Sequence, residues 1–502
     1  MKLEDFPKEI RPYIIPSHKG MMIYKCIECN HTFSIENLLY TCPDCGKILL
    51  IYDQNFNRLK EISGKLWRKI FDYRKMLTKP SALKGIYLYH EFIGSVIPLE
   101  SVVYLGEGHT PVVEANAYMQ KKVGIRFFVK NDGQNPSASF KDRGMASALS
   151  YIRFLIQKGL TSNVLAICAS TGDTSAAAAL YTAFLQPHIK SAVILPHKKV
   201  TPQQLSQPLG CGASVFEIPG VFDDCMKVVE HLSENYNVAL LNSKNAWRIL
   251  GQESFAYEIS QAFEYDMANK TVLIPVGNAG NITAIMNGFI KFFETGIINT
   301  LPKIIGVQSE HANPVYQYYL EPDESKRKFT PVKVKPSVAQ AAMIGNPVSM
   351  PRVIHLANLY NRMAKKKSVF FVEVSEQMIM DCELEANRNG HIICTQGGES
   401  LAGLTKALSQ GILKHHETAI LDSTAHSLKF SGFTDMYFGN GFPKEFHISP
   451  DPTFINHPCF IHPENVKKDT ISKKTLKEND FNLFVKQISD NIAASLKLKK
   501  KK

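Results

Sequence analysis

Short apolar runs rich in β-branched residues alternate along this chain with longer segments whose apolar residues recur at helical spacing. Between about residues 100 and 436, the runs VLAICAS, SAVILPH and TVLIPVG are each followed by a turn and a helical pattern. This alternation is typical of βαβ units, in which parallel strands are covered by helices on both faces. The pattern therefore predicts an α/β fold built on parallel sheets.

The pattern differs on either side of this region. Residues 22–52 form a compact segment that contains four cysteines, and residues 53–100 are mixed, with the helical stretch NRLKEISGKLWRKIFDYRKML. After about residue 436 the sequence is polar and rich in proline, and we find no clear periodicity in it. We therefore expect a small N-terminal segment before the α/β region and a polar extension after it.

The composition is that of an ordinary globular protein. The 502 residues are 44% apolar and 21% charged, which suffices for a large core and two to four domains. The sequence has no uncharged apolar run of 18 residues and no apolar signal near its start, so we expect neither a transmembrane helix nor a signal peptide. Ten cysteines are too few for a disulfide-rich protein, which predicts a reducing, cytoplasmic setting.

The net charge of +12 is concentrated at the C-terminus. Residues 463–502 contain 11 lysines and 5 acidic residues, so this segment carries half of the excess charge. We interpret the final SLKLKKKK as a solvated, frayed tail. The alternative is a tail that binds an anionic partner.

Four cysteines in two close pairs predict a zinc ribbon. The pairs are Cys26 with Cys29 and Cys42 with Cys45. Two such pairs can place four thiolates around one zinc, and a closed set of four gives the metal a structural role. Asn30 and Gly46 follow the pairs and suit the left-handed backbone that such turns need. The alternative is a thiol-bearing hairpin that has lost its metal.

Three motifs in the α/β region point to chemistry. Lys141, in KNDGQNPSASFKDRGMA, precedes a helical stretch, and a lysine near a helix N-terminus has a depressed pKa and can act as a nucleophile. The turn in CASTGDTSAAAAL, residues 168–180, suits a carboxylate, and the loop in PVGNAGNITA, residues 275–284, suits a phosphate. A lysine and two anion loops on βα units suggest a pyridoxal-phosphate site.

On these motifs the sequence resembles the threonine synthases, a family of fold-type II pyridoxal-phosphate enzymes, and their plant-like branch most closely. The matching stretches are GEGHTPV, NPSASFKDRG, ASTGDTSAA, GQES, GNAGN, PSVAQAAMIGNPVS and STAHSLKF. The resemblance runs over about residues 100–436, and some threonine synthases also have a similar four-cysteine segment. Residues 437–502 fall outside the resemblance.

The resemblance implies two parallel-sheet domains with the cofactor between them. We expect a zinc-ribbon-like segment over residues 1–52 and a large cofactor-binding domain made of 53–130 and 241–436. A small α/β domain, 131–240, would be inserted in it, and 437–502 would be a polar, basic extension with a disordered tail.

The resemblance also implies roles for individual residues. Lys141 would form the Schiff base with pyridoxal phosphate and then carry protons. Thr424 would bind the pyridine nitrogen, and Asp173 would lie beside the phenolic oxygen of the cofactor. The cofactor phosphate would be held by Gly277, Asn278, Ala279, Gly280 and Asn281. The substrate would be held by Ser170, Thr171, Gly172 and Thr174 at its carboxylate, and by Ser243 and Arg248 at its phosphate.

The sequence departs from the family pattern at two places. Asp173 stands where many relatives have Asn, although the plant-like branch also has Asp. A carboxylate and a phenolate are both acceptors and repel each other unless they share a proton. Residues 394–404 read CTQGGESLAGL where we expect CPHTGVALTAL. Gln396, Gly397 and Glu399 therefore leave the exact substrate open.

The implied reaction converts O-phospho-L-homoserine and water to L-threonine and phosphate, and the family implies a homodimer. A second reading is a sister enzyme such as cysteate synthase, which acts on phosphoserine and sulfite. A third is a non-catalytic protein that binds nucleic acid through the ribbon and the basic tail. The intact lysine motif and anion loops argue against the third reading.

Overall fold

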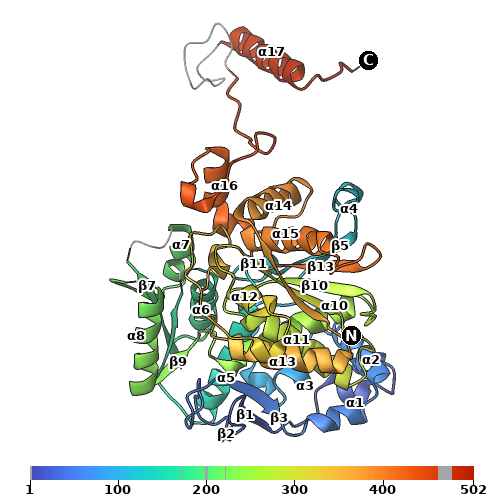
Figure 1. Ribbon diagram of the computed structural model, residues 1–502, viewed down its shortest axis with the longest axis vertical. Helices are drawn as coiled ribbons and strands as arrows, with labels where there is room; N and C mark the ends of the chain where they lie inside the picture. The colour runs from blue at the N-terminus through green and yellow to red at the C-terminus, as the bar shows by residue number, and fades with distance from the viewer. Residues whose placement is uncertain (1–2, 171, 198–201, 221, 462–476, 502) are drawn as a thin grey trace. The chain divides into compact units, whose positions relative to one another are not determined.

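The computed structural model describes residues 3–170, 172–197, 202–220, 222–461 and 477–501 (Figure 1). The chain forms two units, Met1–Ser449 and Pro450–Lys502. The first unit contains three sheets, together with the cysteine pairs and the lysine and anion-loop motifs named above.

The largest sheet has six strands in the order β12-β11-β10-β13-β5-β4. All neighbouring strands are parallel except β4 and β5. The strands are β4 (Val112–Glu114), β5 (Arg126–Asn131), β10 (Lys270–Pro275), β11 (Lys303–Ser309), β12 (Val369–Val374) and β13 (Thr418–Ser423). The central strands β10, β11 and β13 are buried along almost their whole length, as expected for parallel strands covered on both faces.

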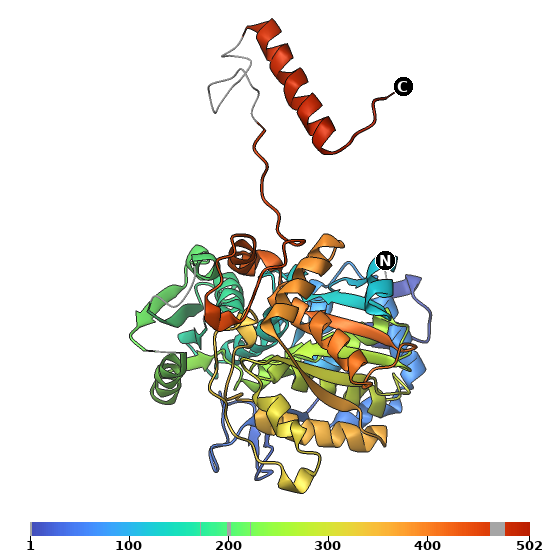
Figure 2. The same cartoon turned by 45° about the horizontal axis from the view of Figure 1, so that its top comes forward.

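A second, entirely parallel sheet has four strands in the order β8-β7-β6-β9. These are β6 (Val164–Ala169), β7 (Ile189–Pro196), β8 (Ser214–Ile218) and β9 (Val238–Leu240). Figure 2 shows this sheet, in green, beside the six-stranded sheet. The predicted α/β fold with two parallel sheets is confirmed.

Helices cover both sheets (Figure 1). On the six-stranded sheet, α14 and α15 lie on one side and α10, α11 and α13 on the other. The helices of the first unit that surround the sheets are α4 (Ala117–Val123), α5 (Lys141–Gln157), α6 (Asp173–Phe184), α7 (Pro202–Gly210), α8 (Phe222–Asn235), α9 (Ala246–Gln252), α10 (Ser254–Ala262), α11 (Gly280–Glu294), α12 (Pro314–Leu320), α13 (Met350–Ala364), α14 (Glu376–Arg388), α15 (Thr395–Ser409) and α16 (Ser431–Phe438).

The N-terminal segment forms a small antiparallel sheet in the order β2-β1-β3. Its strands are β1 (Met22–Cys26), β2 (Thr32–Ser34) and β3 (Leu49–Asp53). In the sequence, helix α1 (Arg11–Ile14) precedes this sheet, and helices α2 (Gly64–Arg74) and α3 (His90–Ile93) follow it. Buried aromatic residues of α2, Trp67 and Phe71, stack on each other and tie this region into the main core.

The second unit contains one described helix, α17 (Glu478–Ser495). The sequence analysis predicted no helix there. Residues 496–501, at the basic end, have no regular structure and are exposed. No helix in the described ranges has both the length and the apolar character needed to cross a membrane.

Candidate active site

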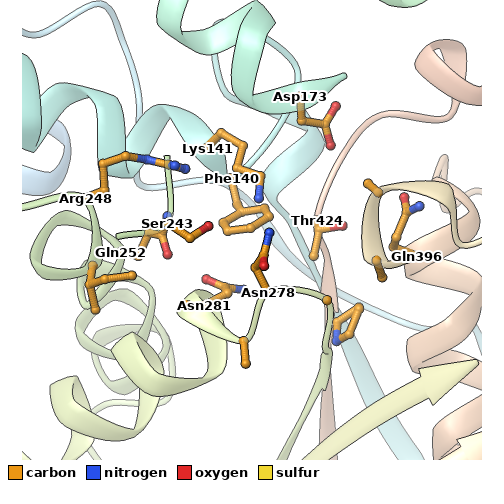
Figure 3. A pocket seen from close by; sticks show the side chains of 17 residues that line it. Phe140, Lys141, Asp173, Ser243, Arg248, Gln252, Asn278, Asn281, Gln396 and Thr424 are labelled. Carbon is orange, nitrogen blue, oxygen red and sulfur yellow. The ribbon is translucent and has the colours of Figure 1, made fainter. Parts of the chain in front are cut away.

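A pocket of about 570 Å³, partly open to solvent, lies at the carboxyl ends of β10 and β13 (Figure 3). Most of the residues predicted from the sequence line it: Lys141, Asp173, Ser243, Arg248, Gly277, Asn278, Ala279, Gly280, Asn281 and Thr424. Ser170, Gly172 and Thr174 are not among the lining residues, and Thr171 lies outside the described residues. Ligand sites in α/β proteins are expected at this edge of the sheet.

Backbone pairing brings Lys141 next to Thr424. The amide of Phe140 donates to the carbonyl of Thr424 at 2.8 Å, and Ser139 forms a bridge with Ala425. Lys141 is the first residue of α5, and Thr424 directly follows β13. The start of the helix is therefore fixed to the end of a central strand.

The amine of Lys141 lies in a pocket that favours its neutral form. Its Nζ is 4.3 Å from the centre of the Phe140 ring, and Figure 3 shows it between Arg248 and Thr424. Burial, together with the positive charge of Arg248, lowers the pKa of Lys141 to about 7. A large fraction of this lysine is therefore unprotonated near neutral pH, as a nucleophilic amine must be.

A buried ion network holds α5 in place. Arg143, two residues after Lys141, donates to Asp132 at 2.8 Å and to Glu258 at 2.6 Å. All three side chains are inaccessible to solvent or nearly so, and Lys130 also pairs with Glu258. A buried network in which every charge has a partner fixes the relative orientation of the helices and strands that carry it.

Glycines let α5 and α9 approach each other. A Cβ atom at Gly251 would lie 2.2 Å from the carbonyl oxygen of Arg143, and one at Gly144 would lie 3.0 Å from that of Arg248. Because the helices touch at these points, Arg248 on α9 reaches the same pocket as Lys141 on α5.

The loop 277–281 presents backbone amides to the pocket. It joins β10 to α11, whose first turn has no side-chain cap, so the N-terminal amides of this helix are available to an anion. Ala279 has a left-handed backbone, φ 61°, and a Cβ at Gly277 would come within 2.8 Å of the Cα of Ala342. The loop is thus shaped as an anion cradle.

Arg248 is a buried cation without an acidic partner in the described chain. Its Nη1 donates to the carbonyl of Leu241 at 2.8 Å, and its buried Nε has no hydrogen-bond partner. Burial lowers its pKa to about 10. A buried guanidinium with an unused donor, next to Ser243 in the pocket wall, is suited to binding an anion.

Lys429 is a site residue that the sequence analysis missed. Its Nζ lies 2.9 Å from Asp173 and donates to the carbonyl of Ser137 at 2.8 Å. Asp173 starts α6, whereas Lys429 comes from the STAHSLKF stretch. The pair therefore connects the segment after β13 to the helix that follows β6 of the smaller sheet.

The unusual stretch 394–404 enters the pocket through Gln396 alone. Gly397 and Glu399 lie in α15 away from the lining. With its amide oriented to satisfy its neighbours, Gln396 accepts from the backbone amides of Gln340 and Ala341 at 3.2 and 3.1 Å. Gln396 thereby holds a wall of the pocket in place. Phe140 and Gln252 are further lining residues to which the sequence analysis gave no role.

The four cysteines of the N-terminal segment converge as predicted. Cys26 and Cys45 have their sulfurs 3.5 Å apart, and Cys29 lies 3.6 Å from both Cys42 and Cys45. Sulfurs bound tetrahedrally to one zinc at about 2.3 Å are about 3.8 Å apart, so these residues fit the ion. Two residues that follow the pairs, Asn30 and Gly46, have the expected positive φ values of 60° and 70°.

This segment contacts the helices that carry pocket residues. The hydroxyl of Tyr24 on β1 accepts from the indole N–H of Trp247, which precedes Arg248. Arg352 on α13 donates to the carbonyl of Leu49 on β3 at 2.7 Å and to the carbonyl of Ser243 at 3.0 Å. The ribbon therefore supports the Ser243–Arg248 side of the pocket from behind.

Comparison with known proteins agrees with this geometry. Residues 103–421 match the family model described as pyridoxal-phosphate dependent enzyme. A threonine synthase of Methanocaldococcus jannaschii is 34% identical over 414 residues, which is 81% of this chain and 93% of that protein. The chain belongs to the threonine synthase family. A chloroplastic threonine synthase 2 of Arabidopsis thaliana is 32% identical over 80% of this chain and 75% of its own length.

Solved structures show the same fold as this threonine synthase family member. The structure of threonine synthase from Escherichia coli superposes with a TM-score of 0.62 at 20% identity, covering 85% of this chain and 94% of that one. Maize serine racemase gives a TM-score of 0.51 at 16% identity, covering 66% and 92%. The predicted family and fold class are confirmed.

The pocket fits the cofactor after which the family model is named. It combines a partly neutral lysine amine, an uncapped helix N-terminus and a hydroxyl at Thr424. Several buried polar atoms in its wall have no partner, among them Gln252 Oε1, Asn281 Oδ1 and Arg248 Nε. Buried polar atoms are normally paired, so these atoms are consistent with a polar ligand.

Proposed function

We propose that this protein converts O-phospho-L-homoserine and water to L-threonine and phosphate. The observation that carries the proposal is the pair of anion sites flanking Lys141. One is the backbone cradle of residues 277–281. The other is the buried guanidinium of Arg248, which has no carboxylate partner among the described residues. A phosphorylated cofactor and a phosphorylated substrate require two such sites on either side of one amine.

The cofactor, when bound, supplies a conjugated ring that takes up the electron pair left by a proton removed from Cα. We assign its phosphate to residues 277–281 and its pyridine nitrogen to the hydroxyl of Thr424. Lys141 attaches it, and the same Nζ moves protons at Cα and Cβ of the substrate. A pKa of about 7 suits a group that must both accept and donate protons at neutral pH.

The substrate phosphate is assigned to Arg248 and Ser243. The guanidinium can donate two parallel hydrogen bonds to phosphate, and its burial makes this interaction stronger than at the surface. The substrate carboxylate is assigned to Ser170, Thr171, Gly172 and Thr174, which are neighbours of Asp173 in the sequence. The positive charge of Lys429 compensates the negative charge of the Asp173 carboxylate, which we assign to the side of the cofactor's phenolic oxygen.

We also propose a metal, a cellular location, a domain division and an oligomeric state, each from a single observation. The four-cysteine site binds one structural zinc, supported by its sulfur spacing. A cytoplasmic location is supported by ten unpaired cysteines. The three sheets support the parts 1–52, 53–130 with 241–436, and 131–240, and the separate unit Pro450–Lys502 supports an extension over 437–502. A homodimer follows from the family resemblance.

Phosphate release from two phospho-amino acids tests the proposed function. We expect purified protein with cofactor to release phosphate from O-phospho-L-homoserine alone, with stoichiometric threonine. It should be inactive on O-phospho-L-serine with sulfite. Release of phosphate and formation of cysteate from the second pair, without threonine from the first, would contradict the proposal and identify the sister enzyme.

A further inference from the structure

We propose that Glu310, His311 and His447 form a second metal site, which takes a divalent transition ion such as Zn²⁺. The ligand atoms of these three residues all lie within 4.8 Å of one another. Glu310 and His311 directly follow β11, and His447 follows the 3₁₀ turn Lys444–Phe446. The site is separate from both the pocket and the cysteine ribbon.

The two imidazoles are spaced as ligands of one ion. His311 Nε2 lies 3.2 Å from His447 Nδ1. Two nitrogens bound tetrahedrally to zinc at 2.0–2.1 Å are separated by about 3.3–3.4 Å, so an ion fits between them with little movement. Two imidazoles and one carboxylate are a ligand set that first-row transition ions prefer to Mg²⁺ or Ca²⁺.

The surroundings of His311 orient it for metal binding. Its Nδ1 lies 2.6 Å from the carbonyl oxygen of Pro336 and must donate to it, which leaves the Nε2 lone pair facing His447. Glu376 is 3.7 Å from the same Nδ1. Metal-bound histidines almost always donate their other N–H to a carbonyl or carboxylate in this way.

The exposure of the three ligands fits a site that gains and loses an ion. His311 is 3% exposed, whereas Glu310 and His447 lie at the surface. Three protein ligands leave at least one coordination position for water. The ion would fasten the segment around His447 to the loop that begins at Pro336 and continues to Ala341 and Ala342 in the pocket wall.

Metal analysis of the full-length holoprotein tests this site. His447→Ala and Glu310→Gln change exposed ligands, and His416→Ala changes an exposed histidine away from the site. After equilibration with Zn²⁺ and removal of free metal, we expect wild-type protein and His416→Ala to hold one zinc more per chain than His447→Ala. Glu310→Gln should weaken the binding at least tenfold. The difference does not depend on whether the ribbon itself is filled.

Cobalt gives a second readout that separates the two sites. With Zn²⁺ already present in the ribbon, Co²⁺ bound by nitrogen and oxygen should give weak visible bands without thiolate charge transfer, and His447→Ala should abolish them. Equal zinc contents in wild-type and His447→Ala protein would overturn the proposal. So would cobalt bands that persist in His447→Ala, because the two histidines would then form only a hydrogen bond.

Discussion

The ion pair of Asp173 with Lys429 explains a residue that is puzzling in the sequence alone. A carboxylate beside the phenolic oxygen of the cofactor would repel it, because both groups are hydrogen-bond acceptors. Lys429 lies 2.9 Å from Asp173, and both side chains are largely buried. The lysine supplies the positive charge that makes an acidic residue tolerable at this position.

A double-mutant cycle tests this explanation. Lys429→Met should weaken cofactor binding about tenfold or more, since removing one partner leaves the other charge buried and unpaired. In an Asp173→Asn background the same change should have little effect. Cofactor affinity is measured by titration of the visible absorbance. Equal losses in both backgrounds would show that the two residues act independently.

The depressed pKa of Lys141 predicts how cofactor capture depends on pH. Only the unprotonated amine attacks, so the rate at which cofactor-free protein captures pyridoxal phosphate should rise with pH around 7 and level off above it. Arg248 lowers this pKa, so Arg248→Met should move the midpoint to higher pH. Arg126→Met, on the exposed surface, is the control. A wild-type midpoint near 10, as for a solvated lysine, would contradict the account.

The N-terminal ribbon and α9 act as connected elements. Tyr24 on β1 bonds to Trp247, and Trp247 stacks on Tyr151 of α5 with ring centres 4.2 Å apart. Helix α5 begins with Lys141, and helix α9 carries Arg248. Both helices therefore meet the ribbon at the same group of aromatic side chains. Loss of the ribbon fold should disturb the Arg248 side first.

Removing one thiol of the ribbon tests this connection. Cys26→Ser should release about one zinc per chain and lower Tm by about 5 °C or more, because a structural zinc contributes directly to folding. It should also raise KM for the phosphorylated substrate more than it weakens cofactor binding. The control is Cys459→Ser, at an exposed cysteine of the second unit. An unchanged zinc content and Tm would refute the ribbon.

Elements with a local signal could be predicted, and contacts between distant segments could not. The run TVLIPVG and the helical pattern after GNAGN correctly predicted β10 and α11 with the loop between them. Lys429 was missed because its pairing with Asp173 leaves no periodic trace in the sequence. The helix α17 was missed although Phe481, Val485, Ile488 and Ile492 recur at helical spacing, because the polar surroundings hid this pattern.

For the molecule as a whole, the basic C-terminus belongs to the second unit, whereas all of the residues that line the pocket belong to the first. Deleting residues 497–502 should leave kcat/KM within about twofold at both low and high salt, because residues 497–501 are exposed and contribute no side chain to the pocket lining. A fall in kcat/KM at low salt that disappears at high salt would show instead that the tail attracts the anionic substrate.

The fate of the oxygen atom of water tests the central claim most directly. The protein is allowed to react with O-phospho-L-homoserine in ¹⁸O-enriched water, and the ¹⁸O content of each product is measured by mass spectrometry. Loss of phosphate from Cγ followed by addition of water at Cβ places one ¹⁸O in the threonine hydroxyl and none in the phosphate, and Lys141→Ala should form neither product. Labelled phosphate together with homoserine would show simple phosphate-ester hydrolysis and contradict the account.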